Sequence, residues 1–310
     1  MALARPLAVA LLTLPTSALA GPCLEWRPAE AIGTLDTSLI NEASGIAVSR
    51  TVSDRLYHNN DSGDGPYFYQ TDGRGGETRR IAVDGFAPRD VEDIALGPCA
   101  GAATCLFLGD IGDNARNRDS VTFVELVEQP EFAETVTPLR LVNVRYPDGP
   151  HNAESFALHP DGDLFLITKA LDRADRTTAT TQIFRLSAAQ LAESSGVIQT
   201  FELVGTIDLR ALMTDELAAQ GATAMDISAD GTRTLILTYR AILEWQQDLS
   251  RPLEPESSAT GLDYSLTPLQ SVSQAEAIAL LPADDAIVYS TELLRGASEA
   301  PLRRVACARR

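Results

Sequence analysis

The chain has 310 residues, of which 45% are hydrophobic and 22% charged, so it has enough apolar material for a globular core. Its 43 acidic and 25 basic residues give a formal net charge of −18 at neutral pH. Phosphate backbones and anionic lipids repel such a surface, which excludes nucleic acids and anionic membranes as expected partners.

The first twenty residues have the pattern of a secretory signal. The segment MALARPLAVALLTLPTSALA combines one arginine with an apolar run and a small-residue ending, and we place the cleavage site after Ala20. No other apolar stretch approaches the roughly 20 residues that a membrane span needs. The sequence therefore predicts a signal peptide at 1–20 and a single domain at 21–310. We expect the mature protein to be periplasmic or extracellular, and monomeric.

Four cysteines in an oxidising compartment predict two disulfide bonds. Cys99 and Cys105 flank the short segment AGAAT, which one disulfide could staple into a loop. Cys23 and Cys307 then pair by elimination, which joins the two ends of the predicted mature chain. A loop of that length is worth roughly 5 kcal/mol in the chain-entropy model. Chain ends that meet indicate a closed architecture.

Short apolar strands recur along the chain, and each repeat begins with a similar segment. These first strands are EASGIAV (42–48), VEDIAL (91–96), AESFAL (153–158), AMDISA (224–229) and AEAIAL (275–280). The second strands are RLYHNN (55–60), CLFLGD (105–110), DLFLIT (163–168), TLILTY (234–239) and AIVYST (286–291). The turns HPDGD and SADGT contain Asp-Gly pairs typical of hairpins.

Two further strands follow in most repeats. Third strands are predicted at 67–71, 121–126, 182–187, 242–247 and 302–306, and fourth strands at 78–83, 139–144, 201–206 and 264–269. The chain ends before the fifth repeat has a fourth strand, and CLEWRP (23–28) is a candidate to replace it. This pattern predicts an all-β, five-bladed β-propeller closed by the N-terminal strand, with six blades, one of them degenerate, as the alternative. Short helices are expected only in the connections 187–195 and 209–221.

Polar residues recur where each first strand begins and where each second strand ends. In a propeller the first strand lines the central channel, and the loop after the second strand opens on the same face. The entrances carry Glu42, Glu92, Asp93, Glu154, Asp226 and Glu276. The exits carry Asn60, Asp61, Asp110, Asp113, Asn114, Lys169, Tyr239, Arg240 and Glu292. We therefore expect these side chains to gather at one mouth of the channel.

Carboxylates that converge on a narrow channel must be protonated, paired with a base or neutralised by a metal. Oxygen ligands favour a hard cation, and calcium is the one that a secreted protein meets at useful concentration. The sequence thus predicts a site for calcium or a similar hard cation. The predicted ligands are Glu92, Glu154, Glu276, Asp226, Asp61, Asp110 and Asp113. The alternative is a ring of acids that cap backbone amides at strand starts.

Lys169 is the only lysine among the 25 basic residues, and Arg240 occupies the equivalent exit in the next blade. Above an acidic ring the two cations could hold an anionic group of a substrate, or Lys169 could donate a proton. Alternatively, both only neutralise the ring through salt bridges. His151 is the histidine nearest the predicted mouth and completes the candidate catalytic set. The chain contains no H-E-x-x-H, G-x-S-x-G or dinucleotide-binding motif.

The segments NEASGIAVS, HNNDSGDG, DVEDIAL, FLGDIGDN, YPDG and NAESFAL together resemble a group of exported bacterial β-propeller proteins. The resemblance covers most of the mature chain and thins in the fourth blade, where TAMDIS lacks the glutamate found two places before the apolar anchor. More distantly, the acid-lined channel is similar to that of phytase-like, lactonase-like and apyrase-like propeller hydrolases. Those families hold calcium on the axis and hydrolyse phosphate esters, phosphoanhydrides or lactones. The resemblance implies metal ligation by Glu92, Glu154 and Glu276, with Asp61, Asp110 and Asp113 nearby.

Two functions remain open at this point. The first is a secreted calcium-dependent hydrolase of phosphate esters or related small anionic esters, in which the ion polarises the scissile group and activates a water molecule. The second is a non-catalytic propeller whose channel is organised by an ion or by salt bridges and whose rim binds a ligand or a protein. The expected partner is accordingly a small anionic molecule or an unidentified protein.

Overall fold

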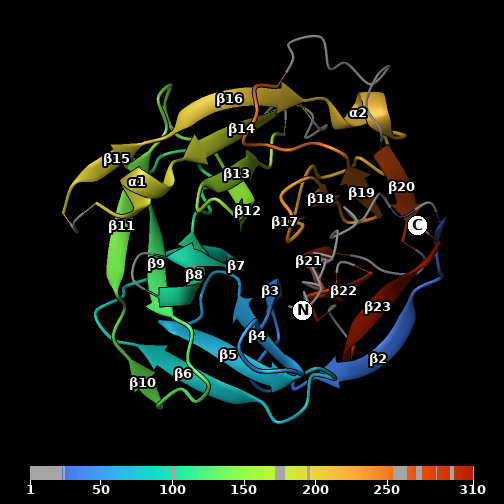
Figure 1. The fold of residues 1–310 in the computed structure, drawn as a ribbon, viewed down its shortest axis with the longest axis horizontal. Coiled ribbons are helices and arrows are strands. Elements are labelled where there is room, and N and C mark those ends of the chain that lie inside the picture. Colours follow the sequence, from blue (N-terminus) through green and yellow to red (C-terminus); the bar gives the residue numbers. More distant parts are fainter. Residues whose placement is uncertain are drawn as a thin grey trace, which may run out of the picture.

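The computed structural model describes residues 23, 25–99, 102–171, 179–193, 196–253, 264–269, 274–283, 285–293 and 297–309. Five β-sheets surround a central axis and contain nearly all of the regular structure (Figure 1). The predicted signal peptide lies outside the described residues. Among the residues that are described, no helix is long and apolar enough to cross a membrane.

One inner strand of each sheet lines the axis. These strands are β3 (Ala43–Val48), β7 (Val91–Cys99), β12 (Ala153–Leu158), β17 (Ala224–Ile227) and β21 (Ala275–Leu280). Each contacts the next one round the axis, and β21 contacts β3, so the inner strands form a closed ring. All five coincide with the predicted first strands. The repeated apolar residues on which that prediction rests are buried between neighbouring blades.

The remaining strands extend each blade outward by antiparallel pairing. The second strands are β4 (Arg55–Asn60), β8 (Ala102–Asp110), β13 (Leu164–Thr168), β18 (Thr234–Leu237) and β22 (Ala286–Thr291). The third strands are β5 (Tyr67–Asp72), β9 (Val121–Val127), β14 (Thr181–Leu186), β19 (Ala241–Trp245) and β23 (Ala300–Arg309). The fourth strands are β6 (Arg79–Val83), β11 (Arg140–Arg145), β16 (Glu202–Ile207) and β20 (Tyr264–Pro268). The five-bladed propeller is therefore confirmed, and the described residues form no sixth blade.

The N-terminal segment closes the fifth blade. β2 (Glu30–Leu35) pairs antiparallel with β23, and β1 (Glu25–Trp26) pairs with the far end of the same strand. Closure by the N-terminus is confirmed, but the main closing strand is β2, and the predicted segment 23–28 supplies only the two residues of β1. The disulfide between Cys23 and Cys307, with Cα atoms 5.7 Å apart, fastens this end to β23.

Short elements in the connections add detail that the repeat did not predict. β10 (Thr135–Val136) and β15 (Ile198–Thr200) pair in parallel with β6 and β11 at the outer edges of the first two blades. The predicted helices are present but are one turn long, at α1 (Ala188–Leu191) and α2 (Leu209–Leu212). Covering an outer edge with another strand reduces the number of unpaired backbone groups there.

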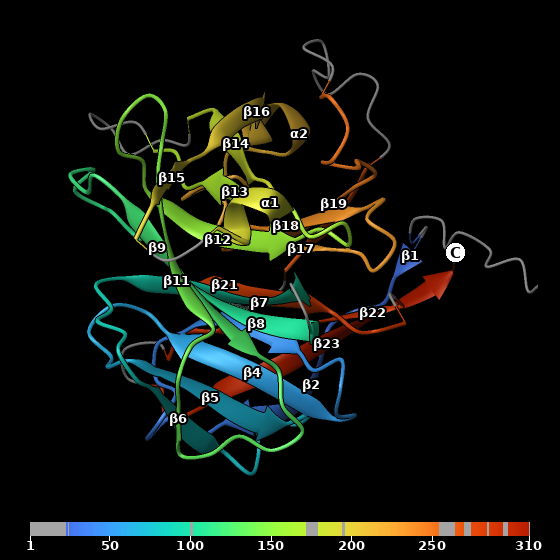
Figure 2. The same cartoon turned by 60° about the vertical axis from the view of Figure 1, so that its left-hand side comes forward.

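Figure 2 shows β12, β7 and β4, which belong to three successive blades, one above another. The hydrophobic core lies mainly between adjacent blades. Between the second and third blades, the rings of Phe123 and Phe156 meet edge to face with centroids 5.1 Å apart. Phe184 and Phe201 belong to the same buried cluster. Because each blade buries its faces against two neighbours, opening the ring would expose core on both sides of the break.

Removing the closing disulfide should destabilise the protein more than removing the hairpin disulfide, Cys99–Cys105, which links residues only six apart. In the chain-entropy model Cys23→Ser with Cys307→Ser costs roughly 5 kcal/mol, and Cys99→Ser with Cys105→Ser costs roughly 2 kcal/mol. Denaturant titration of the mature protein and the two double variants measures both losses. Equal losses would contradict a closing role for Cys23–Cys307.

Candidate functional site

Three buried glutamates stand on β-bulges at the start of inner strands. Glu92, Glu154 and Glu276 are each the second residue of their strand, where the pairing with the second strand shifts register. A bulge re-aims a side chain that would otherwise follow the alternation of the sheet. Ser44 occupies the same bulge in the first blade, whereas β17 pairs without a shift and has Met225 at this position. Three of the five blades therefore bring a glutamate to one end of the channel. That end, with Asp61, Asp90, Lys169, Tyr239 and Glu292, is called the acidic mouth below.

A carboxylate triad forms one side of the acidic mouth. Asp61, after β4, and Asp90, before β7, each have a carboxylate oxygen within 4.8 Å of one from Glu92 and of each other. Glu92 is only 3% exposed, and its Oε2 accepts a hydrogen bond from Ser44 Oγ at 3.4 Å. Three carboxylates at this spacing are suitable ligands for a hard divalent cation. Asp90 was not among the predicted ligands.

Gly112 makes room for two members of the triad. A Cβ atom on Gly112 would lie 2.3 Å from Asp90 Oδ2 and 2.4 Å from Glu92 Oε1, which is closer than non-bonded atoms approach. The Gly112 amide also donates a hydrogen bond to the backbone carbonyl of Asp90 at 3.1 Å. The loop GDIGDN therefore shapes the acidic mouth through a residue without a side chain.

The two aspartates of that loop hold the loop itself. Both Asp110 oxygens pair with the Arg118 guanidinium, at 3.0 and 2.9 Å, and Oδ1 also accepts the backbone amide of Asp90 at 2.8 Å. Asp113 accepts the backbone amides of Asn117 and Arg118 at 3.0 and 2.8 Å. The structure does not bring Asp110 and Asp113 into the triad, because these interactions occupy their carboxylates.

Asp226 joins neighbouring inner strands instead of facing the triad. One of its oxygens accepts the next amide of its own strand at 2.8 Å, and the other accepts the amide of Leu280 in β21 at 2.7 Å. Asp93 does the same between β7 and β12, where it accepts the amide of Phe156 at 3.0 Å. Both carboxylates cap backbone amides, which was the alternative to metal binding.

A buried ion pair forms the other side of the acidic mouth. The Lys169 ammonium donates a hydrogen bond to Glu154 Oε2 and lies 3.4 Å from the Tyr239 hydroxyl and 5.0 Å from the centre of its ring. Burial alone would lower the pKa of Lys169, but the neighbouring Glu154 and Tyr239 raise it above its usual value. Lys169 is therefore a protonated, buried cation at neutral pH.

Burial and mutual repulsion raise the pKa values of the acidic side chains at this end. Burial raises the pKa of Asp90 to about 6, with the charge of Asp61 as the next cause. Burial, followed by the charge of Glu154, also raises the pKa of Glu92 well above its usual range. Burial raises the pKa of Glu154 to about 7, although Lys169 acts against the rise. A cation at the triad would relieve these penalties.

Two glutamates of the fifth blade lie side by side. Burial raises the pKa of Glu276 to about 9, and the hydrogen bond and charge of Glu292 are the next causes. Gln274 Nε2 donates to Glu292 Oε2 at 2.7 Å, and Glu276 is also hydrogen-bonded to Tyr239. Glu276 is thus a protonated carboxyl group at neutral pH that donates a hydrogen bond to Glu292 and accepts one from the Tyr239 hydroxyl.

The structure places two of the predicted catalytic residues elsewhere. Arg240 is half-exposed and lies 3.6 Å from Glu216, also an exposed side chain. His151 Nε2 lies 2.8 Å from Asp148 Oδ1, and its ring meets Tyr146 edge-on at 5.0 Å. In the described part of the chain, neither side chain forms a hydrogen bond, ion pair or ring contact with a residue of the acidic mouth.

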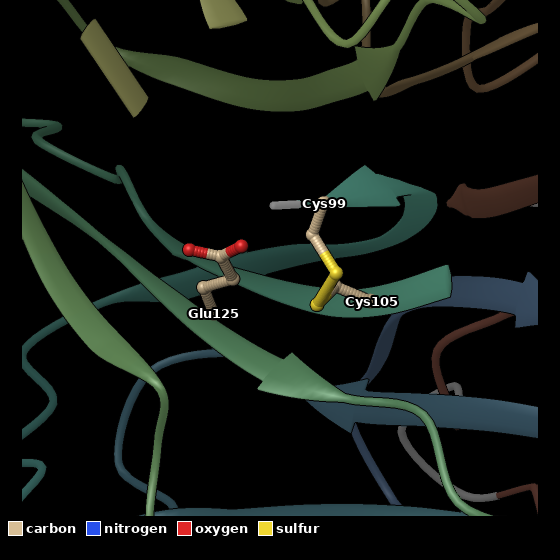
Figure 3. Close-up of side chains that lie close together, drawn as sticks. All are labelled: Cys99, Cys105 and Glu125. Carbon is tan, nitrogen blue, oxygen red and sulfur yellow. A yellow bond between two sulfur atoms is a disulfide. The ribbon is translucent and has the colours of Figure 1, made fainter. Parts of the chain in front are cut away.

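A second group of potential ligands surrounds the hairpin disulfide. Figure 3 shows Cys99 and Cys105 bonded to each other, with the Glu125 carboxylate nearby. Glu125 Oε2 lies 2.6 Å from the Arg140 Nε. Because the sulfurs are oxidised and the carboxylate is paired, this group is not a metal site. The two disulfides are compatible with the predicted periplasmic or extracellular location.

Comparisons with known proteins add little to this geometry. No family model and no curated protein matches the sequence. Similar solved structures include a putative oxidoreductase (glucose dehydrogenase) of Thermus thermophilus, with 12% identity over 91% of this chain and 100% of that chain, and a TM-score of 0.47. The holo pyranose dehydrogenase PQQ domain of Coprinopsis cinerea has 10% identity over 84% of this chain and 81% of that one, with a TM-score of 0.45.

Hydrazine synthase of Kuenenia stuttgartiensis is a third similar structure, with 12% identity over 81% of this chain and a TM-score of 0.39. The chain spans only 56% of that protein's length. With TM-scores below 0.5, none of these activities is transferred to this chain. The β-propeller expected from the family resemblance is confirmed by the sheets themselves, and none of these three proteins is named as a hydrolase.

Replacing Glu276 by glutamine should stabilise the metal-free protein at high pH. The folded-state pKa of about 9 exceeds the ordinary 4.5, so the stability from the protonated carboxyl is fully present below about pH 4.5 and is lost as the pH rises toward 9. Glutamine imitates the protonated form. With chelator present, Glu276→Gln should therefore raise the Tm at pH 8.5, by roughly 2–4 °C for each kcal/mol gained in the free energy of unfolding. At pH 5 the Tm should change less.

The matched control is Glu193→Gln, an exposed glutamate in the connection after α1. Differential scanning calorimetry at both pH values measures the shifts. A Tm gain of equal size at pH 5 and pH 8.5, or a loss at pH 8.5, would show that Glu276 is not held in its protonated form.

Proposed function

We propose that the acidic mouth binds a hard divalent cation, with calcium the first candidate, and that the ion and Lys169 together promote hydrolysis of a small anionic ester. The observation that supports this proposal is the triad of Asp61, Asp90 and Glu92, whose carboxylate oxygens lie within 4.8 Å of one another. Within the described residues, no salt bridge joins any of the three to a basic side chain. A cation is the remaining way to offset their repulsion while they are ionised.

The donor set and the compartment both favour calcium. Calcium takes six to eight oxygen ligands, and the triad supplies carboxylate oxygens while leaving positions for water and for a substrate. The two disulfides are typical of the oxidising compartments in which calcium is abundant. Gly112 also fits this role, since its missing side chain leaves the space that Asp90 and Glu92 occupy.

The residues beside the triad have the properties that ester hydrolysis requires. A bound cation would polarise the ester and lower the pKa of a water molecule. Lys169 supplies a permanent positive charge that would stabilise the negative charge that develops in the transition state. Glu154, whose pKa burial raises above its ordinary value, is the carboxylate that would accept a proton from water. A bound cation would also offset the repulsion between the ionised triad and an anionic substrate.

One observation favours a second function, a non-catalytic propeller. The ion pair between Lys169 and Glu154 is complete without a ligand, and the two residues are only 8% and 6% exposed. In that case an ion at the triad would only organise the channel, and the rim would bind a ligand or a protein. Turnover distinguishes the two functions, because only the first requires the Lys169 ammonium for activity.

Calcium should raise the Tm of the mature protein, and excess chelator should reverse the rise. Binding at 100 times the Kd adds about 2.7 kcal/mol, or roughly 5–10 °C for a chain of this size. Glu92→Gln and Gly112→Ala should abolish the shift, the first by removing a ligand and the second by displacing two. Thermal melts with calcium, magnesium and chelator measure it.

The control for these melts is Glu193→Gln, which should keep the full calcium shift because the residue is exposed and remote from the triad. The cation site is wrong if no ion shifts the Tm of the wild-type protein, or if Glu92→Gln responds to calcium as the wild type does.

Calcium-loaded protein should hydrolyse at least one substrate in a panel of phosphate monoesters, lactones and aryl esters. Lys169→Met and Glu154→Gln should each lower kcat by roughly 100-fold to 10,000-fold, while Arg240→Gln, whose side chain pairs with Glu216, should not. Steady-state kinetics measures the effect. If calcium shifts the Tm but no substrate turns over, the hydrolase is refuted and the non-catalytic function is favoured.

A further inference from the structure

The channel holds a cavity of about 480 Å³ at the end away from the acidic mouth. Its wall is formed by the middle and last residues of β3, β7, β17 and β21 and by the loops that follow β3 and β21. Glu92, Glu154 and Glu276 of the acidic mouth are instead the second residues of their inner strands. All inner strands surround one axis (Figure 1). Because different parts of these strands line the cavity and the acidic mouth, the two are separate sites along that axis.

The wall of this cavity is mostly apolar. Ile46, Ile94, Ile227 and Ile278, the equivalent apolar residues of four inner strands, all contribute to it, together with aliphatic neighbours such as Leu96. Contact between an apolar wall and water is unfavourable. A ligand with an apolar body therefore gains affinity by displacing that water. The volume lies in the range of roughly 300–1,000 Å³ that is typical of small-molecule sites.

One cationic side chain lines the cavity and has no ion-pair partner among the residues that the structure describes. Arg50, in the loop after β3, is exposed, and in the described ranges no carboxylate forms an ion pair with it. The other charged residue of the wall, Asp226, uses its carboxylate oxygens on backbone amides at 2.8 and 2.7 Å. An available positive charge therefore stands at an apolar cavity in a protein of net charge −18.

We propose that this cavity binds a small carboxylic acid with an apolar body, of the size of a medium-chain fatty acid. The carboxylate pairs with the Arg50 guanidinium, whose planar donors match the two carboxylate oxygens. The hydrocarbon body lies against the four isoleucines of the inner strands. The apolar wall favours ligands with a hydrocarbon body, and Arg50 favours an anion over a neutral alcohol of the same length. This site is independent of the proposed cation site.

Calorimetric titration of decanoate into the mature protein tests the proposal, with chelator present so that no ion occupies the acidic mouth. Decanoate should bind saturably at one site, and each methylene removed in octanoate and hexanoate should weaken binding roughly fourfold. Arg50→Gln should weaken decanoate at least tenfold but change decanol less than twofold. Arg74→Gln, another exposed arginine, is the matched control and should bind as the wild type does.

A second variant tests the position of the site without disturbing the core. Ala229 is exposed and lines the cavity, so Ala229→Phe should fill the entrance, leave the Tm nearly unchanged and abolish binding of both decanoate and decanol. The proposal is overturned by an absence of saturable decanoate binding below its micelle concentration, by equal affinity in Arg50→Gln and wild type, or by full binding in Ala229→Phe. None of these results bears on calcium binding.

Discussion

Pairing between the first and last strands is the constraint on which the rest of the structure depends. β2 and β23 complete the fifth blade, and Cys23–Cys307 fastens them. Only when the ring is closed do the five inner strands point their first residues at one end of a common channel. The convergence of charge at the acidic mouth is thus a consequence of closure. The same closure leaves the other end of the channel lined by aliphatic residues.

Bringing these carboxylates together is electrostatically unfavourable, and apart from protonation, as at Glu276, their partners relieve the repulsion in three ways. Asp110 is neutralised by Arg118, and Asp226 is satisfied by backbone amides. Glu154 is paired with Lys169. The described residues give the triad of Asp61, Asp90 and Glu92 no ion pair with a basic side chain, although its carboxylate oxygens are close enough together to bind one metal ion. The carboxylates therefore differ in function because of their partners, although they occupy similar positions in the repeat.

The strands and the bulged glutamates could be predicted from sequence because both follow from a repeated apolar pattern. Side-chain partners could not, since nothing in the repeat indicates that Asp110 faces Arg118 or that Arg240 turns toward Glu216. Asp90 was missed although it immediately precedes β7, at the position that Glu42 occupies before β3, and its Asp-x-Glu spacing to Glu92 was an available signal. Gly112 lay within a quoted motif, but its role depends on a contact between two loops.

Calorimetric titration of calcium into the wild-type protein and two aspartate variants tests the cation site most directly. Asp90→Asn removes a member of the triad, and Asp226→Asn alters a carboxylate that caps backbone amides. We expect one calcium site in the wild type, at least tenfold weaker binding in Asp90→Asn, and nearly unchanged affinity in Asp226→Asn. Unchanged calcium affinity in Asp90→Asn, or a loss confined to Asp226→Asn, would contradict the placement of the ion at Asp61, Asp90 and Glu92.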